Sequence, residues 1–419
     1  MNRMLTIVAI SLCYFVFAVL LNSVGTVILQ SITSFDVTKT DASTLEGFKD
    51  LSIAFVSFFV ASFIPRIGYQ VALCVGLVLV AVVCLLTPLF AEFFFIKILF
   101  AVIGTAFALV KISVYSLIGQ LSDNTESHSS LMNTVEGIFM VGVLSGYWVF
   151  SAFINADDPA SLEWLNVYYL LGGLISLAAI FVYFAPIERE PFMANQDSAL
   201  SEFVDMLKLT YQPLVLIFVI SVFLYVLVEQ GIGSWLPTFN REVLALPVDI
   251  SIQLTSIFAA MIAIGRLLAG FLLRFVPWYV FINACLVMMF LTILLTLPMT
   301  QAVESQGVTG IFDAPLAAYL LPVIGLFMAP IYPLINSVVL SALPNKQHAK
   351  MTGLIVIFSA LGGTFGSILT GAVFDKFGGQ HAFYMSLIPI VMIMLSLFIF
   401  RKLSANNRSV SVEGAQDHE

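Results

Sequence analysis

Charge is scarce in this sequence. Only 10% of its 419 residues are Asp, Glu, Lys or Arg, whereas soluble proteins average about 25%. The basic residues form no continuous stripe, so we expect no nucleic-acid partner. No Gly-Lys-Ser/Thr phosphate loop is present, which argues against ATP as an energy source. The composition therefore fits neither a soluble enzyme nor an ATP-driven machine.

Cysteine and histidine are also rare, with four of each. All four cysteines fall inside apolar stretches without the spacing of metal ligands, which indicates small buried side chains. No histidine lies in the middle of an apolar stretch, so a histidine proton relay is not expected. We predict no metal and no cofactor, with a proton or sodium ion as the only coupling ion.

Long hydrophobic runs are what the chain has in abundance. Apolar residues make up 60% of it, and a membrane-spanning helix needs about 20 mostly apolar residues. We predict an all-α membrane protein with twelve spans. They lie near 4–32, 44–65, 71–90, 93–120, 129–153, 166–185, 213–239, 251–274, 277–297, 315–343, 350–374 and 380–401. The first run is too long for a signal-peptide core, so we interpret it as a helix.

The basic residues are distributed unevenly about these spans. With a cytoplasmic N-terminus, ten Lys and Arg residues fall in inner segments, and only Lys39, Arg241 and Lys376 fall in outer loops. This asymmetry predicts a protein of the plasma membrane, bacterial inner-membrane in type, with both termini cytoplasmic.

The long polar connection after the sixth span divides the chain into two halves. We predict a six-helix bundle over 1–187, a cytoplasmic linker with a short amphipathic helix over 188–212, and a second bundle over 213–402. A disordered tail follows over 403–419. Gly325 lies 221 positions after Gly104, and Gly363 lies 221 after Gly142, which indicates a repeated six-helix unit. Such repeats place a site between the halves.

Two charges lie at similar estimated depth in the first half. Lys111 lies about nine residues from the inner end of its span, and Glu136 lies about seven residues into the next. We predict that they form an ion pair, because an unpaired charge at this depth costs at least about 2.5–3.5 kcal/mol. Such a pair is either a static structural contact or one that breaks and reforms with protonation or substrate.

The seventh span contains Glu229 and Gln230 followed by two glycines, Trp235 and a proline, which predicts a broken helix lining a cavity. Glu229 lies at about the depth of Asp50, and Glu136, Glu229 and Asp50 are our proton-coupling candidates. The alternative for Glu229 and Asp50 is that each caps a helix break or gates the outer face. Trp235 is suited either to stacking on a sugar ring or to anchoring at the membrane interface.

The second span must extend back through Glu46, Lys49 and Asp50 to reach bilayer thickness. Spacings of three and four let Glu46 meet either neighbour on one helix face. The triad is therefore either self-paired and inert or a polar wall of an outer vestibule. Arg266 is suited to a gating role near the inner surface, with substrate contact as the alternative. Uncharged candidates for the substrate cavity are Asn22, Gln30, Tyr332 and Asn336, which also could simply tie helices together.

Three segments resemble a known family. The Glu229–Pro237 stretch is similar to the helix 7 motif of the fucose–galactose–glucose/proton symporter group, within the major facilitator superfamily. Gly325–Pro333 resembles its helix 10 segment, and Arg66-Ile-Gly-Tyr-Gln70 resembles its loop motif, which gives Arg66 a gating or structural role. The chain departs from the family at Asn22-Ser-Val-Gly25, and the family's helix 4 acid is missing near Ala108, one turn before Lys111. The resemblance implies the major facilitator fold.

These observations together predict a secondary active transporter that works by alternating access between two halves. We expect cation-coupled, most simply proton-coupled, uptake of a sugar or similar small polar solute by a monomer embedded in a lipid bilayer. The alternatives are proton antiport that exports a drug or metabolite, and uptake of an organic anion or acidic sugar, which a cavity lysine would favour. A sensor or scaffold with a transporter fold is a third class.

Overall fold

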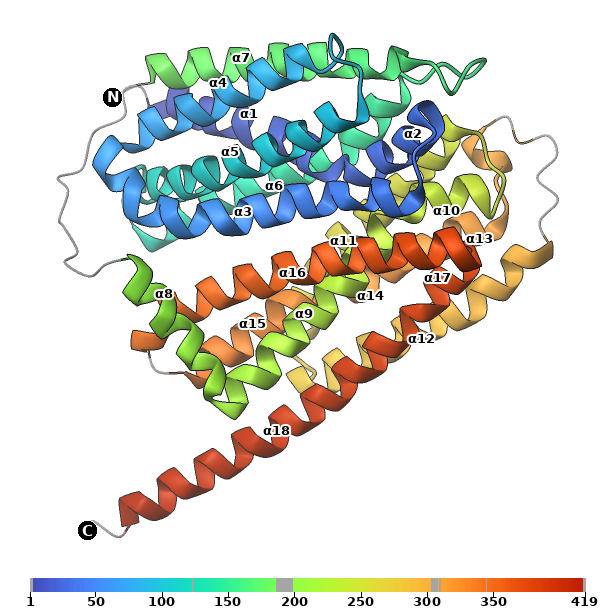
Figure 1. The fold of residues 1–419 in the computed structure, drawn as a ribbon. Helices are drawn as coiled ribbons and strands as arrows, with labels where there is room; N and C mark the ends of the chain where they lie inside the picture. Colours follow the sequence, from blue (N-terminus) through green and yellow to red (C-terminus); the bar gives the residue numbers. More distant parts are fainter. Residues whose placement is uncertain are drawn as a thin grey trace.

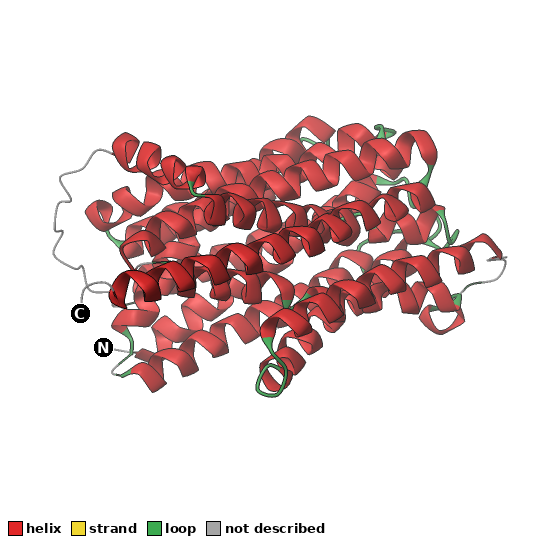
Figure 2. Ribbon diagram, turned by 90° about the horizontal axis from the view of Figure 1, so that it is seen from below, coloured by secondary structure: helices red, strands yellow, loops and turns green. Residues whose placement is uncertain are grey.

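The structure of the protein is a computed structural model, and it describes residues 3–122, 124–185, 199–302, 308, 310–343 and 345–416. Every regular element in these ranges is a helix. The long helices run side by side with loops at both ends, and the two ends of the chain lie at the same end of the bundle (Figures 1 and 2). An even number of crossings follows from that placement.

The first half contains α1 to α7. Their bounds are α1 (Arg3–Asn22), α2 (Val24–Phe35), α3 (Lys39–Ile67), α4 (Tyr69–Leu86), α5 (Phe93–Gln120), α6 (Thr125–Ser151) and α7 (Val167–Phe184). The first two helices form one span with a break at Ser23. Between α3 and α4 the chain turns at Gly68, whose φ of 89° suits a residue without a side chain.

The second half contains α9 to α18, preceded by α8 (Ala199–Lys208), the predicted short helix of the linker. Their bounds are α9 (Pro213–Gly233), α10 (Leu236–Glu242), α11 (Val248–Leu272), α12 (Trp278–Met299), α13 (Leu316–Leu320), α14 (Ile324–Met328), α15 (Ile331–Ala342), α16 (Asn345–Phe377), α17 (Gly379–Met385) and α18 (Leu387–Gln416). Short 3₁₀ turns lie at Leu162–Asn166, Leu209–Tyr211, Thr300–Ala302, Ile311–Asp313 and Leu321–Val323. The predicted linker residues 188–198 lie outside the described residues.

Eleven segments of the described chain are long and apolar enough to cross a membrane. The twelfth crossing is α3, which has 29 residues and packs between α5 and α16. The half of α3 nearer its N-terminus contains the predicted charged triad. The expectation that this helix extends back through residues 46–50 is confirmed, and it begins at Lys39 rather than near residue 44.

One pair of the repeated glycines occupies equivalent packing positions in the two halves. A Cβ at Gly104 would overlap the Lys49 carbonyl of α3, and one at Gly325 would lie 2.8 Å from the Phe258 carbonyl of α11. In each half a helix therefore crosses its neighbour at a glycine. The glycines of the other pair differ: Gly142 faces α1 of its own half, whereas Gly363 faces α3 of the opposite half.

The C-terminal segment differs from the sequence prediction. The structure continues α18 to Gln416, where a disordered tail was predicted from residue 403. Residues 403–413 contain neither proline nor glycine, so nothing in the local sequence ends the helix before Gly414.

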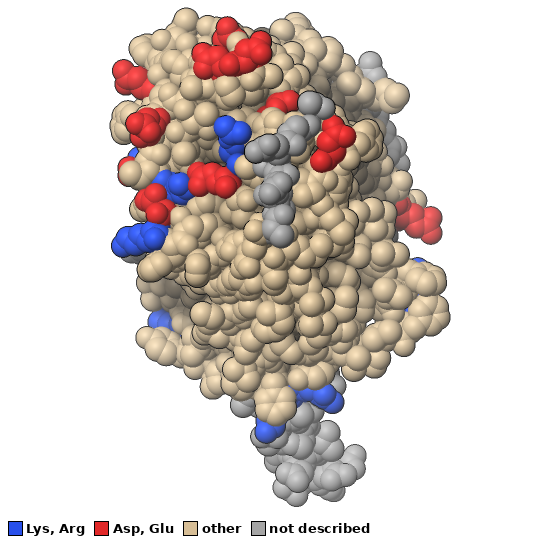
Figure 3. Space-filling view, turned by 90° about the vertical axis from the view of Figure 1, so that its right-hand side faces the viewer, with Lys and Arg blue, Asp and Glu red and all other residues tan. Residues whose placement is uncertain are grey.

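The two halves are joined at the end of the bundle opposite the chain ends. Lys39 Nζ lies 3.1 Å from Glu242 Oε1, and the Thr40 hydroxyl donates to Asp375 Oδ2 at 3.2 Å. A third link runs from Gln253 Nε2 to Ser151 Oγ at 2.7 Å. Figure 3 looks onto this end, where acidic side chains gather over its upper part. These links hold the two halves together at this end of the bundle.

Candidate functional site

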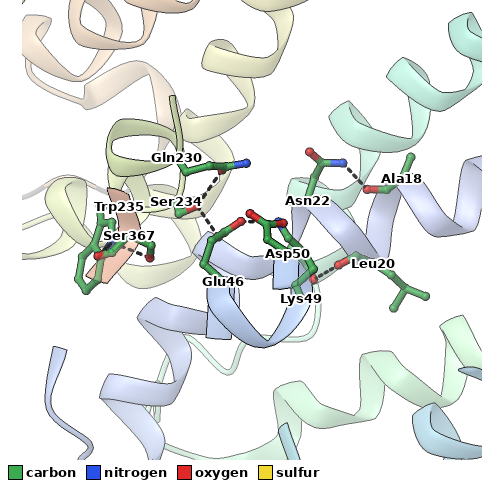
Figure 4. A network of polar contacts seen from close by, with 11 residues as sticks. Ala18, Leu20, Asn22, Glu46, Lys49, Asp50, Gln230, Ser234, Trp235 and Ser367 are labelled. Atoms are coloured by element: carbon green, nitrogen blue, oxygen red, sulfur yellow. Dashed lines mark hydrogen bonds and ion pairs between the residues drawn. The ribbon is translucent and has the colours of Figure 1, made fainter. Parts of the chain in front are cut away.

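The charged triad of α3 is buried between the halves. The exposed fractions of Glu46, Lys49 and Asp50 are 0%, 6% and 9%. The Lys49 ammonium contacts Glu46 Oε1 and lies 3.4 Å from Asp50 Oδ1, so one cation serves two carboxylates (Figure 4). The triad is thus self-paired, as one of the two interpretations predicted, and in this conformation it does not line an exposed vestibule.

The same triad is tied to the second half. The Ser234 hydroxyl donates to Glu46 Oε2 at 2.8 Å, with Gln230 Oε1 as a second acceptor at 3.3 Å. On the other side, Gly363 of α16 lies so close to Asp50 that a Cβ there would overlap Oδ2. The triad therefore lies where α3 meets α9 and α16, and a change of its charge acts on the contact between the halves.

The predicted break of the seventh span is confirmed. Helix α9 ends at Gly233, α10 begins at Leu236, and Ser234 lies between them. The break lies against the first span, because a Cβ at Gly25 of α2 would be 2.7 Å from the Ser234 carbonyl. Glycine at position 25 allows this close approach of two backbones. That the segment moves as an outer gate stays a prediction.

Two predicted cavity residues are packed inside the protein in this conformation. Trp235 is fully buried, its Nε1 donates to the Ser367 carbonyl at 3.1 Å, and its ring lies 5.5 Å from that of Phe374. Gln30 is also buried, and it donates to the Pro159 carbonyl at 2.7 Å. Neither residue is accessible to a solute here, and Trp235 does not anchor at a membrane surface.

The predicted direct pair of Lys111 and Glu136 is not formed. Among the ion pairs of the described residues, none joins the two. Glu136 Oε1 instead accepts a hydrogen bond from the Tyr115 hydroxyl at 2.8 Å. Lys111 Nζ lies 5.8 Å from the ring centroids of both Phe107 and Tyr115. Tyr115 follows Lys111 by one helical turn, a spacing that could have identified it from the sequence.

A similar tyrosine–carboxylate contact occurs in the second half. The Tyr225 hydroxyl lies 3.2 Å from Glu229 Oε1 and 3.0 Å from the Met328 carbonyl. The Tyr332 ring packs 5.8 Å from that of Tyr225, and its hydroxyl bonds to Ser359. Nearby in the sequence, Asn336 has a buried Oδ1 without a hydrogen-bond partner. Tyr225 precedes Glu229 by one turn and was missed by sequence reasoning.

The remaining predicted residues differ in accessibility. Arg266 is exposed, and its Nη1 lies 3.7 Å from Met140 Sδ on α6 of the opposite half. Asn22 is exposed and donates to the Ala18 carbonyl of its own helix at 2.9 Å. Arg66 belongs to α3, but its side chain lies outside the described residues. No group of metal-ligating side chains is found within the described chain.

Comparison with known proteins decides the family. The Major Facilitator Superfamily profile matches residues 10–363 and 309–417. The chain belongs to the major facilitator superfamily. It is therefore an integral membrane transporter rather than an enzyme, which confirms the predicted fold class.

Two curated relatives share 25% identity with the chain. A glucose/galactose transporter of Brucella abortus matches over 346 residues, which are 80% of this chain and 79% of that protein. A TsgA homolog of Buchnera aphidicola matches over 187 residues. The latter match spans 43% of this chain and only 44% of that relative's length.

Solved structures at low identity share the fold. A bacterial homolog of the human lysosomal transporter Spinster, in an inward-facing unoccupied conformation, has a TM-score of 0.72 at 14% identity, covering 96% of this chain and 97% of that one. The nucleoside transporter NupG has a TM-score of 0.70 at 15% identity, and the Escherichia coli fucose:proton symporter FucP has a TM-score of 0.60 at 16% identity. For both of these the match covers 96% of this chain and 99% of the other.

Proposed function

We propose that this transporter takes up a sugar or a similar small polar solute together with a proton, by alternating access. The likeness to the Brucella glucose/galactose transporter over 80% of the chain supports the solute class. The buried triad between the halves supports coupling to a cation, and it is the observation that carries the proposal. The monomer provides both halves of the site.

The triad supports coupling because its charges do not balance. Glu46 and Asp50 share one ammonium, Lys49, so the fully ionised cluster carries an excess negative charge in a buried place. A buried uncompensated charge is costly, and binding one proton removes it. Glu46 of the triad also accepts the hydrogen bond from Ser234 of the second half. Protonation here thus changes the stability of the contact that closes the outer end.

We further propose that the protein lies in the bacterial inner membrane with cytoplasmic termini. The Lys and Arg asymmetry supports this orientation, and it places the end joined by Lys39–Glu242 outside the cell. The structure then corresponds to an inward-facing conformation. Uptake requires the outer contacts to open, the solute and proton to enter, and the halves to rock back.

The experiment is a two-stage assay on the purified full chain. Thermal shift first selects a solute from a panel of hexoses and sugar acids, since a ligand at 100 times its Kd adds about 2.7 kcal/mol. Proteoliposomes with an acidic exterior should then accumulate that solute, and Asp50→Asn, Glu136→Gln or Glu229→Gln should abolish accumulation but leave counterflow exchange. Accumulation by all three variants would rule out proton coupling at these carboxylates. Extrusion of the solute driven by an inward proton gradient would indicate the alternative of a proton-antiport exporter. Binding of the solute without any transport would indicate the alternative of a sensor.

A further inference from the structure

Lys111 and Arg266 lie well inside their spanning helices, and neither has an ion-pair partner in the described part of the chain. Lys111 of α5 and Arg266 of α11 are both exposed. Among the described residues, the lysines of spanning helices that form ion pairs are Lys39, Lys49 and Lys350. Leaving a charge unpaired at this depth is expensive, so such a residue usually faces a partner or a water-filled path.

The carboxylates nearest to these cations already have other donors. Tyr115 donates to Glu136, and Tyr225 lies within hydrogen-bond distance of Glu229. A tyrosine hydroxyl satisfies a carboxylate oxygen without bringing a positive charge. The two tyrosines therefore take up carboxylate oxygens, and neither carboxylate forms an ion pair with Lys111 or Arg266.

Both cations flank one turn of α6. Lys111 lies over the ring of Tyr115, whose hydroxyl reaches Glu136. Arg266 reaches across from the opposite half to Met140, which is one helical turn from Glu136 on the same face. One cation thus comes from each half, and Arg266 faces the other half rather than lipid.

We propose that the transported solute is a carboxylate-bearing anion, such as a sugar acid, whose negative charge is held between Lys111 and Arg266. This inference rests on the proposed function and specifies its substrate class. The planar guanidinium matches a carboxylate in a forked pair, and the ammonium adds a point charge. The rings of Phe107 and Tyr115 offer apolar faces to the carbon skeleton. Because the anion attracts one cation from each half, its binding draws the halves together and favours closure of the inner end.

The test compares galactose with galacturonate, in which a carboxylate replaces the hydroxymethyl group of galactose. Gluconate and succinate are added as further anions. Thermal shift and counterflow are measured on the full chain. We expect at least one anion to bind at least about tenfold more tightly than galactose, as one charge-assisted contact provides. Lys111→Met and Arg266→Met should each weaken that binding by about tenfold or more, and Lys111→Arg should retain it.

Lys97→Met is the matched control, because Lys97 lies on the same helix with its Nζ 4.8 Å from the Phe93 ring centroid. It should bind the anion as the wild type does. Exchange of galactose without exchange of any anion overturns the inference while leaving sugar uptake intact. No exchange of any solute overturns both. Anion binding that is unchanged in both methionine variants removes the two residues from the site. The wild-type panel decides on the anion even if a variant fails to fold.

Discussion

The hydrogen bond from Ser234 to Glu46 should set the balance between the two conformations of the transporter. It joins the halves across 2.8 Å, and its acceptor is a fully buried carboxylate. A hydrogen bond to a charged group contributes about 1.5–3 kcal/mol. Ser234→Ala removes it but leaves Glu46 paired with Lys49, so the halves themselves stay folded. The equilibrium should shift by about 10- to 100-fold toward the conformation with an open outer end.

The shift is measurable as accessibility of Ser31, which is fully buried on α2, the helix that packs against α10 of the second half. A cysteine introduced at Ser31 should be labelled from outside at least about tenfold faster in the Ser234→Ala background. The control is Ser221→Ala, because Ser221 is equally buried on α9 and bonds to Ser396 within the same half at 2.8 Å. Equal labelling in the two backgrounds, or an equal acceleration by the control, would refute the reasoning.

Three further changes test the surroundings of the triad and the tyrosine contacts. Lys49→Met should destabilise the protein by about 3–5 kcal/mol, because it leaves buried carboxylates without a cation. Adding Asp50→Asn should recover part of that stability, as measured by thermal unfolding, and no recovery would mean that the two charges are independent. Gly363→Ala should force the Asp50 carboxylate aside and slow transport several-fold, whereas Gly137→Ala, which meets only open space, should be silent; equal rates would contradict the packing. Tyr115→Phe should leave Glu136 to attract Lys111. A double-mutant cycle of Lys111→Met with Glu136→Gln should then show a larger coupling energy in the Tyr115→Phe background than in the wild type, and equal coupling in both backgrounds would contradict the reasoning.

Composition and hydrophobic run length by themselves determine the class of this protein. A chain with 10% charge and twelve long apolar runs has few ways to satisfy its backbone other than as membrane helices. Local chemistry also places the break at Gly233–Leu236 and the outward extension of α3, because glycine, proline and charged residues act on the helix in which they lie.

Contacts between helices are decided by the tertiary structure. Equal depth along two helices does not fix the direction in which side chains point, so Lys111 and Glu136 were predicted to pair, whereas Tyr115 takes the carboxylate. Trp235 looked available to a ligand because a sequence shows a residue type but not its burial. The link from Ser234 to Glu46 joins residues 188 positions apart, and no local pattern encodes it. Sequence patterns specify what each helix must bury, and only the packing of the two halves determines which charges meet and which remain for a solute.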